Sequence, residues 1–213
     1  MRLSLGIFDV FTYAIPGSLY LALGLYLAVR LDWLDAEELG HLPSVLLVSG
    51  IVMISYLVGH LTYFVGSLID RAIPFWRRTP DESCRQFLQR VPAARGRPYI
   101  WAHGPILLAA IERYDKDAAQ EISRLRATGL MLRNCCFPLL AGCGMAVVEA
   151  VVNRNLPVAA VCAVVLGVGG IATVPENQKL RHWAVLKTLE TCFWLPEVDA
   201  ELQPRQRWRF LRR

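Results

Sequence analysis

The chain has 213 residues, of which 54% are hydrophobic and 19% are charged, and its formal net charge is +5. The apolar residues gather in four long segments, at residues 10–29, 45–69, 135–152 and 156–174. This distribution excludes an ordinary soluble globular domain, because the helices of such a domain carry a polar side.

The first apolar segment predicts a membrane helix over residues 1–30, followed by an outer loop at 31–44. Like the other three segments, it has about the 17 to 25 residues that a helix needs to cross roughly 30 Å of hydrocarbon. Its basic start, Arg2, is typical of a signal peptide, but the apolar part is too long for one. No small-residue cleavage site precedes the acidic stretch LDWLDAEEL, so we expect an uncleaved span.

The second segment predicts a membrane helix over residues 45–70 with one polar face. Spacings of four, three and four residues place these side chains on that face: Tyr56, His60, Tyr63 and Ser67. Small residues form the stripe beside it: Ser55, Gly59, Thr62 and Gly66. The first segment repeats the spacing with Tyr13, Gly17, Tyr20 and Gly24. Because small residues let helices approach closely in lipid, we expect the two faces to pack together.

His60 lies at about the same depth as Pro16, if both helices cross the membrane. Pro16 has no N–H to donate to the Thr12 carbonyl, and an unpaired carbonyl is costly in hydrocarbon. We therefore expect His60 to hydrogen-bond the Thr12 carbonyl, Tyr13 or Ser18. Two interpretations stay open, an interhelical hydrogen-bonding pin and a proton or ion site.

Basic residues predict which side of the membrane each loop faces. Residues 71–134 hold twelve Lys and Arg, and residues 175–213 hold eight, whereas the loop at 31–44 is acidic. Cytoplasmic loops hold the excess of Lys and Arg, so both termini and the middle segment are expected in the cytoplasm, most simply at a bacterial inner membrane. Six arginines are expected at anionic lipid headgroups, without any nucleic acid: Arg71, Arg77, Arg78, Arg124, Arg126 and Arg133.

The middle segment, residues 71–134, predicts a small cytoplasmic helical module. A helix is expected over 80–90, with Thr79 as its cap, and an irregular connector follows up to Pro105. Apolar residues then recur every three or four positions, with no breaker before Pro138. We expect one helix from Pro105 into the third span, 135–152, with a kink at Pro138.

The third and fourth spans, 135–152 and 156–174, predict an antiparallel hairpin, because only three residues separate them. Small residues on the fourth span favour close packing: Ala159, Ala163, Gly167 and Gly170. Glu149 is expected to reach the headgroups or to pair with Arg154, with ion coordination as the alternative. The tail, 175–213, is basic and amphipathic, so it either lies along the inner leaflet or packs on the middle module.

No residue pattern indicates catalysis, a metal or a cofactor. The six cysteines form no CxxC pair, and no His stands at zinc spacing from them. The best scatter of polar groups is cytoplasmic, and a solvated helix surface explains its acids better than a pocket does: His103, Glu112, Asp115, Asp117 and His182. We therefore expect a protein that is not an enzyme.

The sequence predicts an all-α integral membrane protein with four transmembrane helices and a cytoplasmic helical module between the second and third. In layout alone it resembles small membrane effectors of bacterial defence and stress systems, and the resemblance carries over no site residue. We expect a homo-oligomer, channel-like or effector-like, gated through the module. The alternative is a scaffold that recruits a soluble partner to the inner leaflet, and a lipid-modifying enzyme or small transporter is a weaker third.

Overall fold

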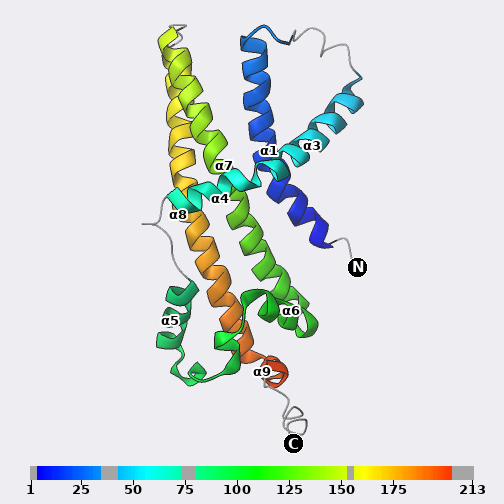
Figure 1. Ribbon diagram of the computed structural model, residues 1–213, viewed down its shortest axis with the longest axis vertical. Helices are drawn as coiled ribbons and strands as arrows, with labels where there is room; N and C mark the ends of the chain where they lie inside the picture. The colour runs from blue at the N-terminus through cyan, green and yellow to red at the C-terminus, as the bar shows by residue number, and fades with distance from the viewer. Residues whose placement is uncertain (1–3, 35–42, 73–79, 153–155, 203–213) are drawn as a thin grey trace, which may run out of the picture. The chain divides into compact units, whose positions relative to one another are not determined.

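The computed structural model describes residues 4–34, 43–72, 80–152 and 156–202, and these residues form helices and no strand (Figure 1). Four helical stretches are long and apolar enough to cross a membrane: Val10–Arg30, Ser44–Ser67, Lys116–Val152 and Pro157–Trp194. The protein is therefore all-α, with the composition of a multi-pass membrane protein.

The chain divides into two compact units. The first contains α1 (Ser4–Arg30), α3 (Ser44–Leu61), α4 (Tyr63–Ala72) and the apolar parts of α7 (Lys116–Val152) and α8 (Leu156–Trp194). The second contains α5 (Pro80–Arg90), two 3-10 turns, η2 (Pro92–Ala94) and η3 (Pro98–Trp101), α6 (Gly104–Tyr114), α9 (Pro196–Leu202) and the remaining parts of α7 and α8. Both α7 and α8 thus contribute residues to both units.

The first unit turns large apolar side chains outward. On α3, Val45 is 75% exposed, and on α7, Val151 is 77% exposed. On α8 the exposed side chains recur along the helix: Val158, Val161, Val164, Val165, Val168 and Ile171. An apolar exterior on this scale marks a surface that contacts lipid or protein instead of water.

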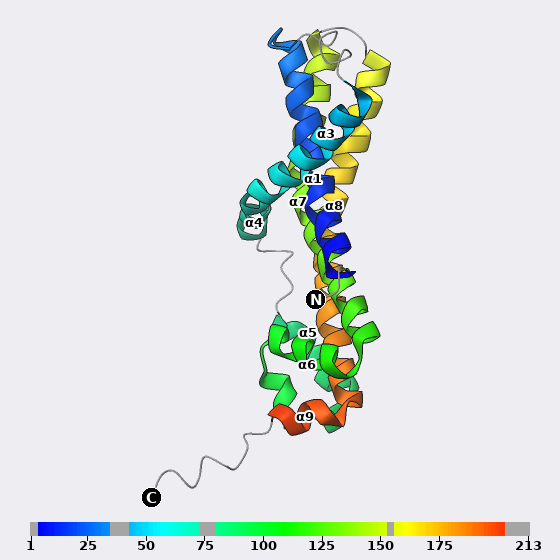
Figure 2. The same cartoon turned by 90° about the vertical axis from the view of Figure 1, so that its right-hand side faces the viewer.

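Two helix pairs build the first unit. Helices α1 and α3 cross in both views (Figures 1 and 2), with Gly17 and Gly59 at the contact. Helices α7 and α8 lie side by side and antiparallel, since Gly142 meets Leu166 and the later position Gly170 meets the earlier Leu140. On α1, Leu23 also approaches Gly142, which joins the two pairs.

The second unit has a conventional buried core. Its members come from α5, the connector, α6, the start of α7, the end of α8 and α9: Phe87, Ala94, Tyr99, Ile100, Leu107, Ile111, Ala119, Ile122, Leu186, Leu189, Cys192 and Val198. Spacings of three and four residues, as in Leu186, Leu189 and Cys192, turn one side of each helix to this core. Of the two alternatives for the tail, residues 179–202 follow the second: they pack with the described part of the middle segment in this unit.

Two helices expected to be continuous are interrupted. The helix from Pro105 ends as α6 at Tyr114, and Asp115 accepts a hydrogen bond at Oδ1 from the Ala118 N–H, 2.9 Å away. Asp115 is therefore the N-cap of α7, because its carboxylate satisfies one of the amides that a helix start leaves unpaired.

The second span is interrupted at Thr62, between α3 and α4. The Thr62 hydroxyl donates to the Val58 carbonyl at 2.8 Å, and the Val65 N–H donates to the Thr62 carbonyl, three residues back instead of four. Such back-bonding by threonine bends helices. The predicted single helix over 45–70 is thus two helices.

The fourth span, in contrast, is longer than predicted. Helix α8 continues through Pro175 to Trp194, so the fourth span and the following segment are one helix, and α7 likewise passes through Pro138. Proline is tolerated inside long membrane helices when neighbouring groups hydrogen-bond to the backbone carbonyl that the proline leaves unpaired. The helix over 80–90 is α5, with the expected bounds, whereas its expected cap, Thr79, lies outside the described residues.

Candidate functional site

The crossing of α1 and α3 leaves no room for a side chain at its centre. A Cβ added to Gly17 would lie 1.7 Å from the Ser55 carbonyl oxygen, and one added to Gly59 would lie 1.9 Å from the Tyr13 carbonyl oxygen. Real Cβ atoms never approach an oxygen so closely. The contact is therefore backbone to backbone, the arrangement that small residues permit in membrane helices.

Aromatic rings gather beside this crossing. The Tyr13 ring of α1 lies 4.6 Å from the His60 ring, and 6.1 Å from the rings of Tyr56 and Tyr63. The Tyr56 and His60 rings stack at 6.2 Å with 20° between their planes. We call these four residues, Tyr13, Tyr56, His60 and Tyr63, the aromatic face. Edge-to-face pairs of this kind contribute about 0.5–1.5 kcal/mol each beyond burial.

The aromatic face is partly open. Tyr56 is 36% exposed and Tyr63 is 37% exposed, and His60 is exposed as well. Of the three partners considered for His60, the structure places Tyr13 against its ring, and Ser18 instead donates its hydroxyl to the Ile15 carbonyl of its own helix. Within the described residues, His60 makes ring contacts and no hydrogen bond. No described residue thus occupies its ring nitrogens.

The remaining residues of the predicted stripes have other neighbours. Tyr20 stacks on Phe137 of α7 with ring centroids 6.2 Å apart, and Gly24 faces open space. Ser67 donates to the Phe64 carbonyl of its own helix. Gly66 meets α7, where an added Cβ would lie 2.2 Å from Asn134 Oδ1. The stripe of small residues thus serves two partners, α1 before the break at Thr62 and α7 after it.

Arg133, which was expected at lipid headgroups, is buried in the first unit. The residue is 7% exposed, its guanidinium lies 4.7 Å from the centroid of the Tyr63 ring, and its Nε donates to Asn134 Oδ1 at 3.4 Å. A cation over an aromatic ring, with a carbonyl acceptor beside it, is a stable way to bury a guanidinium. Arg133 therefore extends the aromatic face toward α7.

The other expected headgroup arginines divide into three groups. Arg124 is exposed, whereas Arg126 is half-buried and donates to the Thr188 hydroxyl at 3.3 Å. Arg77 and Arg78 lie outside the described residues, and only the backbone of Arg71 is described. Of the expected headgroup arginines whose side chains are described, only Arg124 is exposed.

Buried polar groups that the sequence analysis missed lie in α7 and α8 of the first unit. Asn134 and Asn177 are each 2% exposed, and Thr173 and Gln178 are nearly as buried. Asn134 Nδ2 and Asn177 Oδ1 have no hydrogen-bonding partner among the described residues. The signal was present, because Asn134 lies just before the third apolar segment, and Asn177 and Gln178 lie a few residues after the fourth.

Glu149 pairs across to α1. It accepts a hydrogen bond from the Tyr26 hydroxyl, and its Oε1 lies 3.2 Å from Arg30 Nε. The expected partner, Arg154, lies outside the described residues.

On α8, an added Cβ at Gly167 would lie 3.1 Å from Cys143 Sγ of α7, and Ala163, one turn earlier on α8, is half-buried.

In the second unit, two of the scattered polar residues, His182 and Asp115, make hydrogen bonds within the fold. His182 is 6% exposed, with Nδ1 2.7 Å from the Ser83 hydroxyl and Nε2 2.6 Å from Gln86 Oε1. His103 and Glu112 are exposed, and Asp115 caps α7. Among the described residues, no group of three or more His, Cys, Asp or Glu is placed to hold a metal ion.

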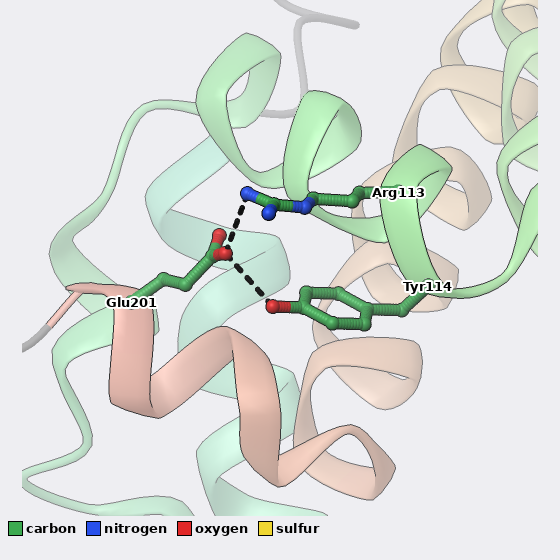
Figure 3. A network of polar contacts seen from close by, with 3 residues as sticks. All are labelled: Arg113, Tyr114 and Glu201. Carbon is green, nitrogen blue, oxygen red and sulfur yellow. Dashed lines mark hydrogen bonds and ion pairs between the residues drawn. The ribbon is translucent and has the colours of Figure 1, made fainter.

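Acidic side chains of helix α9 hydrogen-bond to other parts of the second unit. Glu201 accepts hydrogen bonds from Arg113 at 3.0 Å and from the Tyr114 hydroxyl at 2.8 Å (Figure 3), and the bond to Glu201 raises the pKa of Tyr114. Asp199 accepts from Arg97 at 2.6 Å. Burial, helped by the nearby Asp199 charge, raises the pKa of Tyr99 to about 12.

The polar residues predicted from the sequence thus form a candidate site in the first unit, the partly open aromatic face with Arg133 beside it. Its rings can stack, and its hydroxyls and imidazole can donate or accept hydrogen bonds. Comparisons with protein-family models, with curated proteins and with solved structures gave no match.

Proposed function

We propose that this chain is a multi-pass membrane protein that assembles into homo-oligomers, channel-like or effector-like, at a bacterial inner membrane. Its second unit is the cytoplasmic sensor that gates the membrane helices. The observation that carries the proposal is the partly open aromatic face on helices that otherwise turn apolar side chains outward.

Polar groups that face hydrocarbon without a partner are costly, and imidazoles and hydroxyls hydrogen-bond across helix contacts in membranes. A second copy offers the complementary surface, because it presents the same tyrosines and imidazole. An ion path lined by several copies would use the same groups. Oligomerisation therefore accounts for the exposure of His60 and Tyr56 with no further component.

Gating is supported by the two long helices. Because α7 and α8 belong to both units, a ligand or partner that changes the packing of the second unit shifts helices that also lie in the first. A rigid helix is the simplest carrier of such a shift.

Ion flux from liposomes, measured beside the oligomeric state in detergent, tests this proposal. We expect wild type to form oligomers and release ions, and His60→Ala to lose both. His60→Phe keeps a ring for stacking but has no ring nitrogen, so assembly without flux would assign His60 to the ion path. Leu57→Ala, on the neighbouring exposed apolar surface of α3, is the matched control and should behave as wild type.

Two outcomes contradict the proposal. Monomers in every detergent would remove the oligomer, and vesicles that stay tight with wild-type protein would remove the channel. Tight vesicles together with a soluble protein bound specifically to the second unit would favour the scaffold.

A further inference from the structure

An apolar pocket of about 760 Å³ lies inside the first unit, between α1, α7 and α8. Aliphatic side chains form most of its walls, among them Leu19, Leu23, Leu139, Met145, Val158 and Leu166. The volume is within the range of roughly 300–1,000 Å³ that is typical of small-ligand sites. In a bilayer, a pocket with such walls takes up hydrocarbon.

One part of the pocket wall is charged. Glu149 and Tyr26 both line the pocket, and the Tyr26 hydroxyl donates a hydrogen bond to the Glu149 carboxylate. The Nε atom of Arg30 lies 3.2 Å from Oε1 of that carboxylate. The side chains of Arg30 and Glu149 are 49% and 25% exposed, so both remain accessible from outside. An apolar pocket therefore adjoins a cation and an anion that lie next to each other.

We propose that this pocket binds one phospholipid with a zwitterionic phosphoethanolamine head group. An acyl chain fills the apolar volume, the phosphate accepts hydrogen bonds from Arg30, and the ammonium group donates to Glu149. The inference rests on the membrane insertion proposed above.

Charge complementarity selects this head group. A guanidinium binds phosphate oxygens well, and a carboxylate binds an ammonium group through charge-assisted hydrogen bonds. A zwitterionic head group offers a group of opposite charge to each member of the Arg30–Glu149 pair at once. An anionic head group such as phosphoglycerol supplies the phosphate but brings no ammonium group for Glu149, and it places a like charge beside that carboxylate.

Native mass spectrometry of the full-length protein in mild detergent, with equal phosphatidylethanolamine and phosphatidylglycerol added, measures the bound lipid. We expect about one phosphatidylethanolamine per chain, as for one ligand site. Ala159→Trp fills the pocket from α8 and should lower retention about tenfold, equivalent to about 1.4 kcal/mol. Ala160→Trp, the exposed neighbour that does not line the pocket, should retain lipid as wild type does.

A second pair guards against a folding defect in the first. Met145→Trp enters the pocket from α7, and Val147→Trp on the same helix does not line it, so the same contrast is expected. Glu149→Gln should retain lipid but lose the preference for phosphatidylethanolamine over phosphatidylglycerol, because the partner of the ammonium group is gone.

Equal lipid retention in the pocket variants and their controls would overturn the proposal, as would a wild-type preference for phosphatidylglycerol. A helix of a second copy in the pocket would also overturn it: lipid would be absent from wild type, and Ala159→Trp would instead break the oligomer. Membrane insertion fails separately, and would do so if the chain were monodisperse in water without detergent.

Discussion

At Gly17 and Gly59, a hydrogen atom occupies the only space that the crossing of α1 and α3 leaves. The atoms that an added Cβ would meet are backbone carbonyl oxygens, which cannot rotate away as a side chain can. An added methyl group therefore has to separate the two helices. Gly24 and Gly50, on the same two helices, face open space.

Gly17→Ala or Gly59→Ala should lower the free energy of unfolding by about 1–3 kcal/mol or more, as overpacking does. Gly24→Ala and Gly50→Ala should be neutral or stabilise by about 0.5–1 kcal/mol, because alanine favours the helix interior. Thermal unfolding in detergent, followed by circular dichroism, measures all four. A loss of stability as large at Gly24 as at Gly17 would show that helix propensity, and not the close contact, decides.

Tyr99 should make the protein sensitive to alkaline pH. Its pKa rises from 10.0 to about 12 on folding, chiefly because the phenol is buried, so folding favours the protonated form. The contribution of this raised pKa to the free energy of unfolding is fully present below pH 10 and is lost as the pH rises toward 12. Tyr99→Phe should therefore remove part of the fall in melting temperature above pH 10.

At neutral pH, Tyr99→Phe should be neutral or stabilise by up to about 1 kcal/mol, because the buried hydroxyl has no partner among the described residues. A clear loss of stability at neutral pH would mean that the hydroxyl is hydrogen-bonded, for example through water to Asp199, whose Oδ1 is also unpaired there.

The candidate site could be predicted from the sequence in composition, but only in part in arrangement. Spacing places Tyr13, Gly17, Tyr20 and Gly24 on one face, yet crossing helices touch over a short length, so Tyr20 meets α7 and Gly24 meets nothing. The burial of Arg133 could not be predicted, because an arginine at the end of an apolar segment is normally solvated and nothing local reveals the Tyr63 ring beside it.

For the helices, local sequence signals predicted where a helix begins better than where it is interrupted. Proline and acidic residues located α5 correctly, and proline and glycine located the irregular connector after it. The breaks at Asp115 and Thr62 were missed because both residues also occur inside helices, and their side-chain hydrogen bonds decide the matter. The fourth span was predicted to end at residue 174, yet α8 continues through Pro175 to Trp194, and its distal part packs in the core of the second unit.

Asp115→Ala should lower the free energy of unfolding by about 1 kcal/mol, since it removes the N-cap of α7. Asp115→Asn and Asp115→Ser retain a capping oxygen and should be close to wild type. Hydrogen exchange of the first turn of α7, in particular of the Ala118 amide, reports the cap directly. Unchanged protection at Ala118 in Asp115→Ala would contradict this assignment.

At the scale of the whole molecule, charge and hydropathy predict four apolar helices and a basic side, but they do not predict which distant segments meet. The core of the second unit joins Phe87 and Ile111 to Leu189 and Val198, far apart in the chain. The amphipathic pattern around Ile111 and the one around Leu189 are both visible in the sequence. Whether they pack against each other or against lipid depends on the shapes of the two surfaces, which periodicity does not contain.

If lipid surrounds the apolar helices and the basic segments mark the cytoplasmic leaflet, Asp35 and Glu112 lie on opposite sides of the membrane. Asp35→Cys and Glu112→Cys, each made after replacing the six native cysteines, can be labelled with a membrane-impermeant maleimide in intact and in permeabilised cells. We predict labelling of Asp35→Cys in intact cells and of Glu112→Cys only after the inner membrane is permeabilised. Equal labelling of the two before permeabilisation would contradict the account.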